Sequence, residues 1–508
     1  MRNASYDHII LGAGAAGCVL ARRLIDAGRR VLLVESGPLR RRHSNVDSVG
    51  GFTNLWNSAL DWALTTVPQV GLANRQITIN QGRLVGGSSA INAMMYVRCH
   101  SGDYHNLQQR CGSLWNAERI QSSFAKLENY IDGPSDFRYQ SGLMSVRNCP
   151  DPRSYSAVFQ RAAVELGYHG DDWDYNGPVQ ENGAGPLQFN ISVDGRRHSA
   201  FNAYLEPILS NPLLTLFSDC SAHHLLYRDN RHVTGVSLLN DRGESIDVYC
   251  DHDVVVACGA LQSPQLLLRS GLGPASALTA AGIPVRADLP MVGQQLQDHL
   301  QLPIIYALTK PLPEPEILTG NVLFLNLNNN SLHGAPDLQL NFTPASPQPL
   351  QQFLPPLGGP VMIFLPILVQ PRSQGEVRIH PDQHCSIDPG YLSDPSDLTV
   401  LDKAIQVVRS MVATSAMQDL VTSELLPADQ NSEQFIRSNA STLWHPVGTC
   451  AMGRDTQNSV VDAHLRVHGI HGLRVVDASV IPRATAGNTH VPTMIVAENA
   501  ASLMIEGH

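Results

Sequence analysis

The sequence lacks several features that mark membrane, disulfide-stabilised and metal-binding proteins. No apolar run approaches the roughly 20 residues that a membrane-spanning helix requires. The 9 cysteines include no Cys-x-x-Cys pair, which argues against a disulfide framework and against a zinc site. No signal-peptide pattern precedes the first apolar strand, which begins within ten residues of Met1. These absences predict a cytoplasmic protein with no membrane span and no bound metal.

Charge is also sparse in this sequence. Charged residues make up 16% of the chain, and the formal net charge is −10 over 508 residues. A mildly acidic protein does not favour nucleic acid or an anionic membrane surface as a partner. The hydrophobic fraction of 43% is ordinary for a globular enzyme, and the length exceeds what one ordinary core supports. We therefore expect two domains, while the oligomeric state stays open.

The N-terminal segment carries a dinucleotide-binding pattern. An apolar strand at residues 9–11 is followed by Gly12, Gly14 and Gly17 at the Gly-x-Gly-x-x-Gly spacing. Gly12 permits a tight turn, and Gly14 lets the backbone approach a pyrophosphate. Gly17 lets the following helix pack closely against the strand.

A second apolar strand at residues 31–34 completes this unit and ends at Glu35. A carboxylate at that point can accept hydrogen bonds from the ribose hydroxyls of an adenosine. The unit predicts a dinucleotide site but does not distinguish FAD from NAD. On this pattern alone, an NAD-dependent dehydrogenase is the alternative, and it would purify as a colourless protein.

Further nucleotide-binding elements are expected far along the chain. Short apolar segments between residues 212 and 258 predict a β-meander that returns to a buried strand. Another apolar strand ends at Asp477, and an amphipathic helix is expected at residues 493–507. Elements of one kind at the beginning, middle and end predict a nucleotide-binding domain that is discontinuous in sequence.

His445 and His490 stand out from the 20 histidines by their context. Pro446 biases His445 toward an extended backbone, and Trp444 suggests a shaped pocket. Because histidine titrates near neutrality, a buried pair can remove and hold a substrate proton. The alternative is that both are core histidines that hydrogen-bond to the backbone.

Taken together, these segments resemble the glucose–methanol–choline (GMC) oxidoreductases, a family of flavoproteins, over essentially the whole chain. The resemblance rests on the glycine pattern at the N-terminus and on segments 82–92, 259–273, 292–299, 444–450 and 477–479, in family order. It implies an α/β fold (α+β overall) with a Rossmann-like FAD-binding domain at residues 1–138, 205–300 and 440–508. A substrate-binding domain, with an antiparallel sheet and helices, is expected at residues 139–204 and 301–439.

The resemblance implies FAD as the cofactor. The residues expected to hold it are Gly12, Gly14, Gly17, Glu35, Ser88, Asn92, Ala93, Met94, Met95, Ala222, Trp444, Asp477, Ala478 and Val491. Non-covalent binding is expected, because Ile91 stands where covalently flavinylated members carry His. Two departures from the family pattern are Cys99, where Gly is usual, and Gln295, where Asn is usual.

The implied activity is oxidation of a primary or secondary alcohol to the carbonyl. His445 would take the hydroxyl proton, hydride would pass to the flavin, and His490 would hydrogen-bond the same oxygen. Oxygen or another acceptor would then reoxidise the flavin. The alternatives are a redox-neutral lyase of the hydroxynitrile-lyase type, a light-driven fatty acid decarboxylase and a non-catalytic flavin-binding protein.

The sequence resembles the family least in the segments expected to form the substrate pocket. Residues 329–360, rich in Pro, Asn, Gln and Leu, are predicted to form a mobile loop or lid. Apolar residues nearby either line the pocket or form strand core: Leu338, Leu340, Phe342, Phe364 and Leu365. If they line it, aromatic or medium aliphatic alcohols are favoured over sugars.

Overall fold

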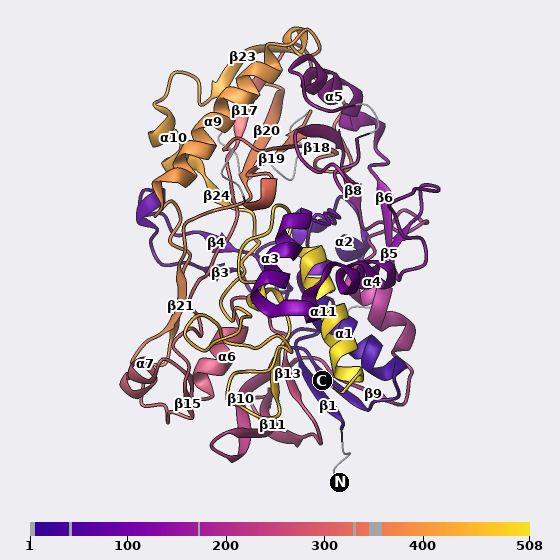
Figure 1. The fold of residues 1–508 in the computed structure, drawn as a ribbon. Coiled ribbons are helices and arrows are strands. Elements are labelled where there is room, and N and C mark those ends of the chain that lie inside the picture. The colour runs from indigo at the N-terminus through magenta and orange to yellow at the C-terminus, as the bar shows by residue number, and fades with distance from the viewer. Residues whose placement is uncertain (1–5, 40–42, 171–172, 329–331, 345–357, 508) are drawn as a thin grey trace.

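A computed structural model describes residues 6–39, 43–170, 173–328, 332–344 and 358–507. Two main sheets lie at opposite ends of the view in Figure 1, with a parallel sheet at the bottom and an antiparallel sheet at the top. The expected α/β fold is confirmed. None of the described helices is both long and apolar enough to cross a membrane.

The parallel sheet has the strand order β25-β13-β1-β2-β9. These strands span Leu473–Val475, Val254–Val256, His8–Leu11, Val31–Val34 and Leu214–Phe217. They come from the beginning, middle and end of the chain, as predicted. Strand β9 belongs to this sheet, where it pairs with β2, and not to the meander in which it was expected. The meander consists of β10 (Cys220–Asp229), β11 (His232–Asn240) and β12 (Ser245–Tyr249).

Helices α1 (Ala15–Asp26) and α11 (His490–Ile505) pack beside each other next to this sheet. Figure 1 shows α11 in yellow along α1. The expectation that the last helix is amphipathic was wrong. Nearly all of its residues are buried, including Glu498, whose carboxylate accepts hydrogen bonds from the Arg23 guanidinium and the Tyr204 hydroxyl. This pairing allows a polar residue to lie inside an otherwise apolar helix environment.

The antiparallel sheet carries the other half of the molecule. Its strands are β7 (Gly183–Pro186), β16 (Leu300–Gln301), β17 (Ile304–Leu308), β18 (Asn321–Leu325), β19 (Leu338–Thr343), β20 (Val361–Leu368), β23 (Val421–Leu426) and β24 (Ser441–Thr442). Helices α5 (Ser156–Glu165), α9 (Pro395–Val412) and α10 (Ser432–Asn439) accompany it. An antiparallel sheet with helices was expected for the substrate-binding half.

Strand β19 corrects the prediction of a lid at residues 329–360. Leu338, Leu340 and Phe342 alternate along the strand and are fully buried, and the Phe342 ring stacks on that of Phe159 in α5 at 5.2 Å. Because successive side chains point to opposite faces of a strand, Gln339 and Asn341 lie on the other face. Two other parts of the expected lid, residues 329–331 and 345–357, lie outside the described residues.

Smaller elements connect and flank the two sheets. They are α2 (Ser44–Asp47), α3 (Ser101–Cys111), α4 (Ala117–Leu127), α6 (Ser263–Arg269), α7 (Ala275–Ala280), β3 (Leu64–Thr65), β4 (Thr78–Ile79), β5 (Glu128–Tyr130), β6 (Met144–Asn148), β8 (Gln188–Phe189), β14 (Leu272–Gly273), β15 (Ala287–Asp288), β21 (Glu376–Ile379) and β22 (Cys385–Asp388). The small sheet β5-β6-β8 crosses the expected boundary after residue 138. The domain boundaries themselves stay predictions.

Two of the departures from the family pattern, Cys99 and Gln295, occupy a special backbone conformation. Cys99 has φ +66° and Gln295 has φ +60°, both in the left-handed region. Gly and Asn adopt that region more readily than other residues. The usual Gly and Asn at these positions therefore fit the backbone better than the residues of this chain.

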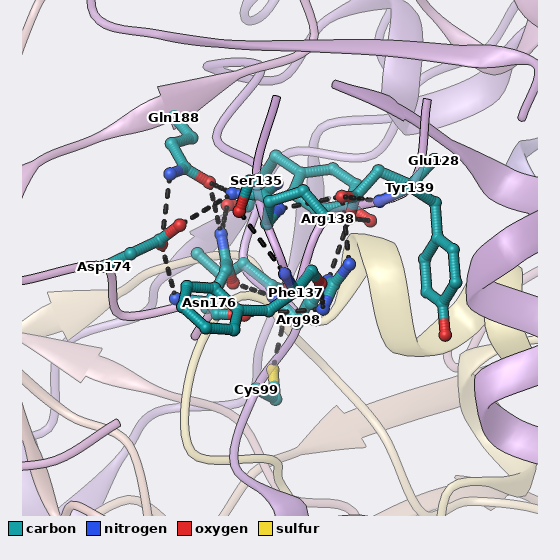
Figure 2. A network of polar contacts seen from close by, with 12 residues as sticks. Arg98, Cys99, Glu128, Ser135, Phe137, Arg138, Tyr139, Asp174, Asn176 and Gln188 are labelled. Carbon is teal, nitrogen blue, oxygen red and sulfur yellow. Dashed lines mark hydrogen bonds and ion pairs between the residues drawn. The ribbon is translucent and has the colours of Figure 1, made fainter. Parts of the chain in front are cut away.

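A largely buried network of ion pairs lies at strand β5 (Figure 2). The Glu128 carboxylate, which is 0% exposed, accepts hydrogen bonds from the guanidinium groups of Arg98 and Arg138 and from the Tyr96 hydroxyl. Arg138 also donates to Asp174 at 3.0 Å. In this network, which we call the Glu128 network, each buried charge has an opposite charge beside it.

Candidate active site

A cavity of about 730 Å³ connects the parallel sheet with the antiparallel sheet. Most of the predicted site residues line it: Gly12, Gly14, Glu35, Ser88, Asn92, Ala93, Met94, Met95, Ala222, Trp444, His445, Asp477, Ala478 and His490. Gly17 and Val491 do not. Gly17 lies against the turn, where a Cβ would come within 1.9 Å of the Gly12 carbonyl oxygen, and Val491 is 1% exposed in the core.

At one end of the cavity, backbone segments approach each other closely. Gly12 has φ +104°, and a Cβ there would lie 2.3 Å from the Ala257 carbonyl oxygen. A Cβ on Gly87 would lie 2.6 Å from the Gly14 Cα. Side chains are therefore excluded where the glycine turn after β1 meets the segment at Gly87, which leaves a cradle lined by backbone.

Glu35 lies at the same end, directly after β2. Its carboxylate accepts hydrogen bonds from the backbone N–H groups of Ala13, at 3.0 Å, and Gly37, at 2.9 Å. Burial raises the pKa of this carboxyl to about 7, although those N–H groups oppose the shift. The carboxylate is thus held in place at the cavity wall by the backbone of its own βαβ unit.

Arg197 fixes the segment that lines the middle of the cavity. Its Nε donates to the Val46 carbonyl oxygen at 2.8 Å, and its Nη1 donates to the backbone and side-chain oxygens of Asn92 at 2.7 and 2.8 Å. The side chain is buried, which lowers its pKa to about 9, and within the described residues it forms no ion pair. No sequence pattern indicated this role, because an isolated arginine follows no recognised spacing.

Asp477 connects two of the distant segments. Its carboxylate accepts hydrogen bonds from the Gly259 N–H at 2.8 Å, the Ser263 hydroxyl at 2.5 Å and the Ser479 N–H at 2.8 Å. Burial raises the pKa of this carboxyl. Asp477 therefore holds the turn before α6 against the end of β25.

His445 lies at the other end of the cavity with a partner at each ring nitrogen. Its Nδ1 lies 3.0 Å from His299 Nδ1, and its Nε2 lies 3.2 Å from Asn488 Nδ2. The Asn488 Oδ1 faces Gln339 Nε2 at 3.4 Å, so the amide N–H of Asn488 points at His445. This orientation makes Nε2 of His445 the hydrogen-bond acceptor, and Nδ1 then carries the proton and donates to His299.

Asp298 fixes the backbone of His445. One carboxylate oxygen accepts the His445 N–H at 2.7 Å, and the other accepts the hydroxyls of Tyr391 at 2.6 Å and Thr442 at 2.5 Å. Burial raises the pKa of Asp298 to about 6. Sequence reasoning placed Asp298 and His299 in a family turn but assigned them no role, and it passed over Asn488 in the His490 motif.

The histidines around the cavity are neutral bases. Burial lowers the pKa values of His299 and His490 to about 4, and Arg197 adds to the effect on His490. Burial, then His299, then His490 hold the pKa of His445 well below its usual range. A neutral histidine with an acceptor nitrogen at the cavity wall can take a proton from a bound hydroxyl.

Comparison with known proteins identifies the family. Residues 6–301 match the N-terminal model of GMC oxidoreductases, and residues 371–497 match the C-terminal model. The chain belongs to the GMC oxidoreductase family. Among its relatives, "Alcohol dehydrogenase [acceptor]" of Pseudomonas putida is 34% identical, covering 98% of this chain and 96% of its own length. "Choline dehydrogenase, mitochondrial" of Mus musculus is 32% identical, covering 99% of this chain and 90% of its own.

A solved structure agrees with this assignment. The pyridoxine 4-oxidase from Mesorbium loti has a TM-score of 0.89 and 30% identity, covering 99% of this chain and 100% of its own. The family implies FAD, and the cavity of this chain fits a dinucleotide. Its glycine cradle excludes Cβ atoms, Glu35 lies at one end, and the N-terminus of α11 meets the cavity at the other. A helix N-terminus favours an anionic group.

Proposed function

We propose that this GMC oxidoreductase oxidises primary or secondary alcohols to carbonyl compounds, with His445 as the general base and His490 as a hydrogen-bonding partner of the alcohol oxygen. The observation that carries the proposal is the pair of partners of His445. Asn488 and His299 leave Nε2 unprotonated toward the cavity and the proton on Nδ1. The names of relatives at 34 and 32% identity, an alcohol dehydrogenase and a choline dehydrogenase, support the same class of reaction.

In the proposed reaction, the two histidines hold the alcohol oxygen, and His445 also takes the hydroxyl proton. The alcohol hydroxyl replaces the Asn488 amide N–H at Nε2 of His445, Nε2 accepts the hydroxyl proton, and the resulting imidazolium donates from Nδ1 to His299. When bound, FAD supplies the acceptor for the hydride that leaves the carbinol carbon. A positioned base typically contributes about 10²–10⁴-fold to the rate, and fixing the alcohol at two histidines adds the advantage of proximity.

Non-covalent FAD binding is part of the proposal. Ile91 lines the cavity, and an aliphatic side chain has no nucleophilic atom with which to form a bond to the flavin. The proposed contacts are Glu35 with the adenosine ribose and Asp477 and Ala478 with the ribityl chain. The residues proposed to contact the pyrophosphate and flavin are Ser88, Asn92, Ala93, Met94 and Met95. The purified protein is expected to be yellow and to release intact FAD when it is denatured.

An anaerobic stopped-flow experiment tests the reaction class. Purified holoprotein is mixed with a panel of primary and secondary alcohols in the dark, and absorbance of the oxidised flavin is followed. Loss of the absorbance, together with stoichiometric carbonyl product, is the expected result. A flavin that stays oxidised while a cyanohydrin is cleaved indicates the lyase alternative. Turnover of a fatty acid only under illumination indicates the decarboxylase.

A second measurement identifies the electron acceptor. The alcohol-reduced protein is mixed either with oxygen or with a quinone, and the rate of flavin reoxidation is compared. A faster reaction with oxygen indicates an oxidase, whereas a faster reaction with the quinone indicates a dehydrogenase. Either result is compatible with His445 as the base.

A further inference from the structure

We infer that the substrate of this site is a neutral, apolar alcohol, and that the site discriminates against the quaternary ammonium alcohol choline. This inference rests on the proposed alcohol oxidation and specifies its substrate. It concerns the substrate half of the cavity, which we define as the part lined by the antiparallel sheet and the segment around His445.

The first argument is the distribution of negative charge. Among the described residues that line the cavity, Glu35 and Asp477 are the carboxylates. Both belong to the parallel sheet, where backbone N–H groups bind them. Asp298 lies near His445 but does not line the cavity, and both its oxygens already accept hydrogen bonds. Within the part of the chain that the structure describes, the substrate half therefore has no carboxylate to pair with a cation.

The second argument is the positive charge around the same half. Arg75 lines the cavity and donates hydrogen bonds to the carbonyl oxygens of Leu72 and Ala440. Arg197 is buried beside the middle of the cavity, where Asp47 is the opposite charge that acts on it without forming an ion pair, and the charge of Arg197 lowers the pKa of His490. The N-terminus of α11 adds a partial positive charge at the same place. A cationic substrate would be repelled by these groups and would lose its hydration without compensation.

The third argument concerns the aromatic residues of the cavity. Phe52, Trp56 and Trp444 line it, and aromatic faces can bind quaternary ammonium groups. These rings are already in contact with one another, with Trp56 at 4.7 Å from Trp444 and 5.5 Å from Phe52. Another cavity tryptophan, Trp62, faces the Arg83 guanidinium at 5.2 Å. Without a carboxylate beside them among the described residues, these rings offer a quaternary ammonium group only the cation–π attraction, which contributes about 0.5–2 kcal/mol.

The antiparallel sheet lines this half with aliphatic side chains and with uncharged polar groups, the latter including Gln301, Thr319 and Ser441. Ile363 and Leu365 on β20 and Leu426 on β23 line the cavity, next to the amide of Asn341 on β19. Strand pairing places Asn341 opposite Leu365. Such a wall favours an apolar tail, since its burial contributes about 25 cal/mol per Å² whereas a buried charge is penalised.

Isosteric alcohols test the inference. Choline and 3,3-dimethylbutan-1-ol have the same shape, but choline carries a quaternary nitrogen where the other has carbon. We expect kcat/KM for flavin reduction to be at least about 100-fold higher with 3,3-dimethylbutan-1-ol. An anionic probe, 3-hydroxy-2,2-dimethylpropanoate, is expected to react at least about tenfold more slowly than the neutral alcohol. Equal or faster reaction with choline or with the anion overturns the inference and leaves alcohol oxidation intact.

A binding measurement tests this inference independently of the proposed alcohol oxidation. Titration of the oxidised holoprotein with each probe, followed by the flavin difference spectrum, gives dissociation constants that need no turnover. If no alcohol reduces the flavin, tighter binding of 3,3-dimethylbutan-1-ol than of choline still supports a neutral ligand. Comparable affinities for the two probes contradict it.

A matched pair of variants locates the discrimination. Asn341→Asp places a carboxylate at the cavity wall, where Gln339 Nε2 donates to the side-chain oxygen of residue 341 at 3.1 Å. Asn341→Ala removes the amide without adding charge. The kcat/KM ratio of choline to 3,3-dimethylbutan-1-ol should rise at least about tenfold in the first variant only. A ratio that rises equally in both variants contradicts the electrostatic argument. FAD content and melting temperature report folding, and the wild-type comparison stands alone if neither variant folds.

Discussion

Arg98 and Cys99 are neighbours in sequence but contact two buried polar clusters of opposite design. Arg98 belongs to the Glu128 network of Figure 2, where carboxylates and guanidinium groups pair. The Cys99 Sγ lies 3.5 Å from the carbonyl oxygen of Asn488, which in turn contacts His445. The histidine cluster consists of His299, His445 and His490. Among the described residues, no carboxylate raises the pKa of any of the three rings, and Arg197 lowers that of His490.

The two clusters show two consequences of burial. In the Glu128 network, buried charges are paired and stabilise the structure, whereas in the histidine cluster, burial keeps the rings neutral and able to accept a proton. In the Glu128 network, Arg98 and Arg138 hold the pKa of the Glu128 carboxyl below its ordinary value despite burial. Its charge is therefore fixed over the range in which enzymes work. In the histidine cluster, burial without an opposite charge keeps the rings neutral. A neutral ring can accept a proton, whereas a permanently paired charge cannot.

The largest effect is expected from removing the base. His445→Gln keeps a polar side chain of similar size but cannot hold a proton. The rate constant of flavin reduction by an alcohol should fall about 10²–10⁴-fold, as measured by anaerobic stopped flow. FAD content and melting temperature should stay near the wild-type values. A variant with full activity would remove His445 from the mechanism.

Disrupting the Glu128 network should lower the stability of the protein. Glu128→Gln leaves two buried arginines without their shared carboxylate, so the free energy of unfolding should fall by about 3–5 kcal/mol. Urea denaturation of the holoprotein measures this change. A loss below about 1 kcal/mol would mean that the network does not act as a buried ion-pair cluster.

The pH dependence should separate the clusters further. Only the neutral form of His445 is a base, so activity is present above its pKa and is lost as pH falls through it. Because that pKa lies well below 6.5, flavin reduction should be constant from pH 8 down to the ordinary histidine pKa and decline only in more acidic solution. A decline that begins above pH 6.5 would show that His445 is not shielded from solvent as described.

His299 should act through His445 and not on the substrate. His299→Leu removes the acceptor that keeps the proton on Nδ1 of His445, and the rate should fall about tenfold. His299→Asn supplies an acceptor oxygen and should restore part of the rate. Since His299 lowers the pKa of His445, the acid limb of the pH profile should move to higher pH in the Asn variant. A purely structural role would leave that limb unchanged.

The smallest effect is expected at an exposed ion pair, which serves as a control for Glu128. Arg22 and Asp26 pair at 2.8 Å on α1, and the Asp26 side chain is 42% exposed. Asp26→Asn should change the free energy of unfolding by less than about 0.5 kcal/mol, because exposed pairs are screened by solvent. The same urea titration measures it. If Asp26→Asn lowered the free energy of unfolding as much as Glu128→Gln does, burial would not explain the difference between the two ion pairs.

Sequence patterns were most reliable where chemistry follows local spacing. The glycine turn, the apolar strands and Glu35 are contiguous in the sequence. The segments that resemble the family contain most of the predicted residues that line the cavity. The patterns failed where neighbours decide the role of a residue. Leu338 and Phe342 proved to be core because α5 covers that face, whereas Asn341, one position away from Phe342, lines the cavity. Arg197 carried no local signal at all.

The sequence by itself determined the family, the parallel nucleotide-binding sheet and the two histidines of the site. These depend on short-range constraints: a tight turn requires glycine, a buried strand requires a run of apolar residues, and both survive as patterns along the chain. Tertiary structure alone decided the protonation and orientation of His445. Those properties depend on His299, Asp298 and Asn488, which different parts of the chain bring to His445. Folding also decides that, among the described residues, the carboxylates of the cavity lie outside its substrate half.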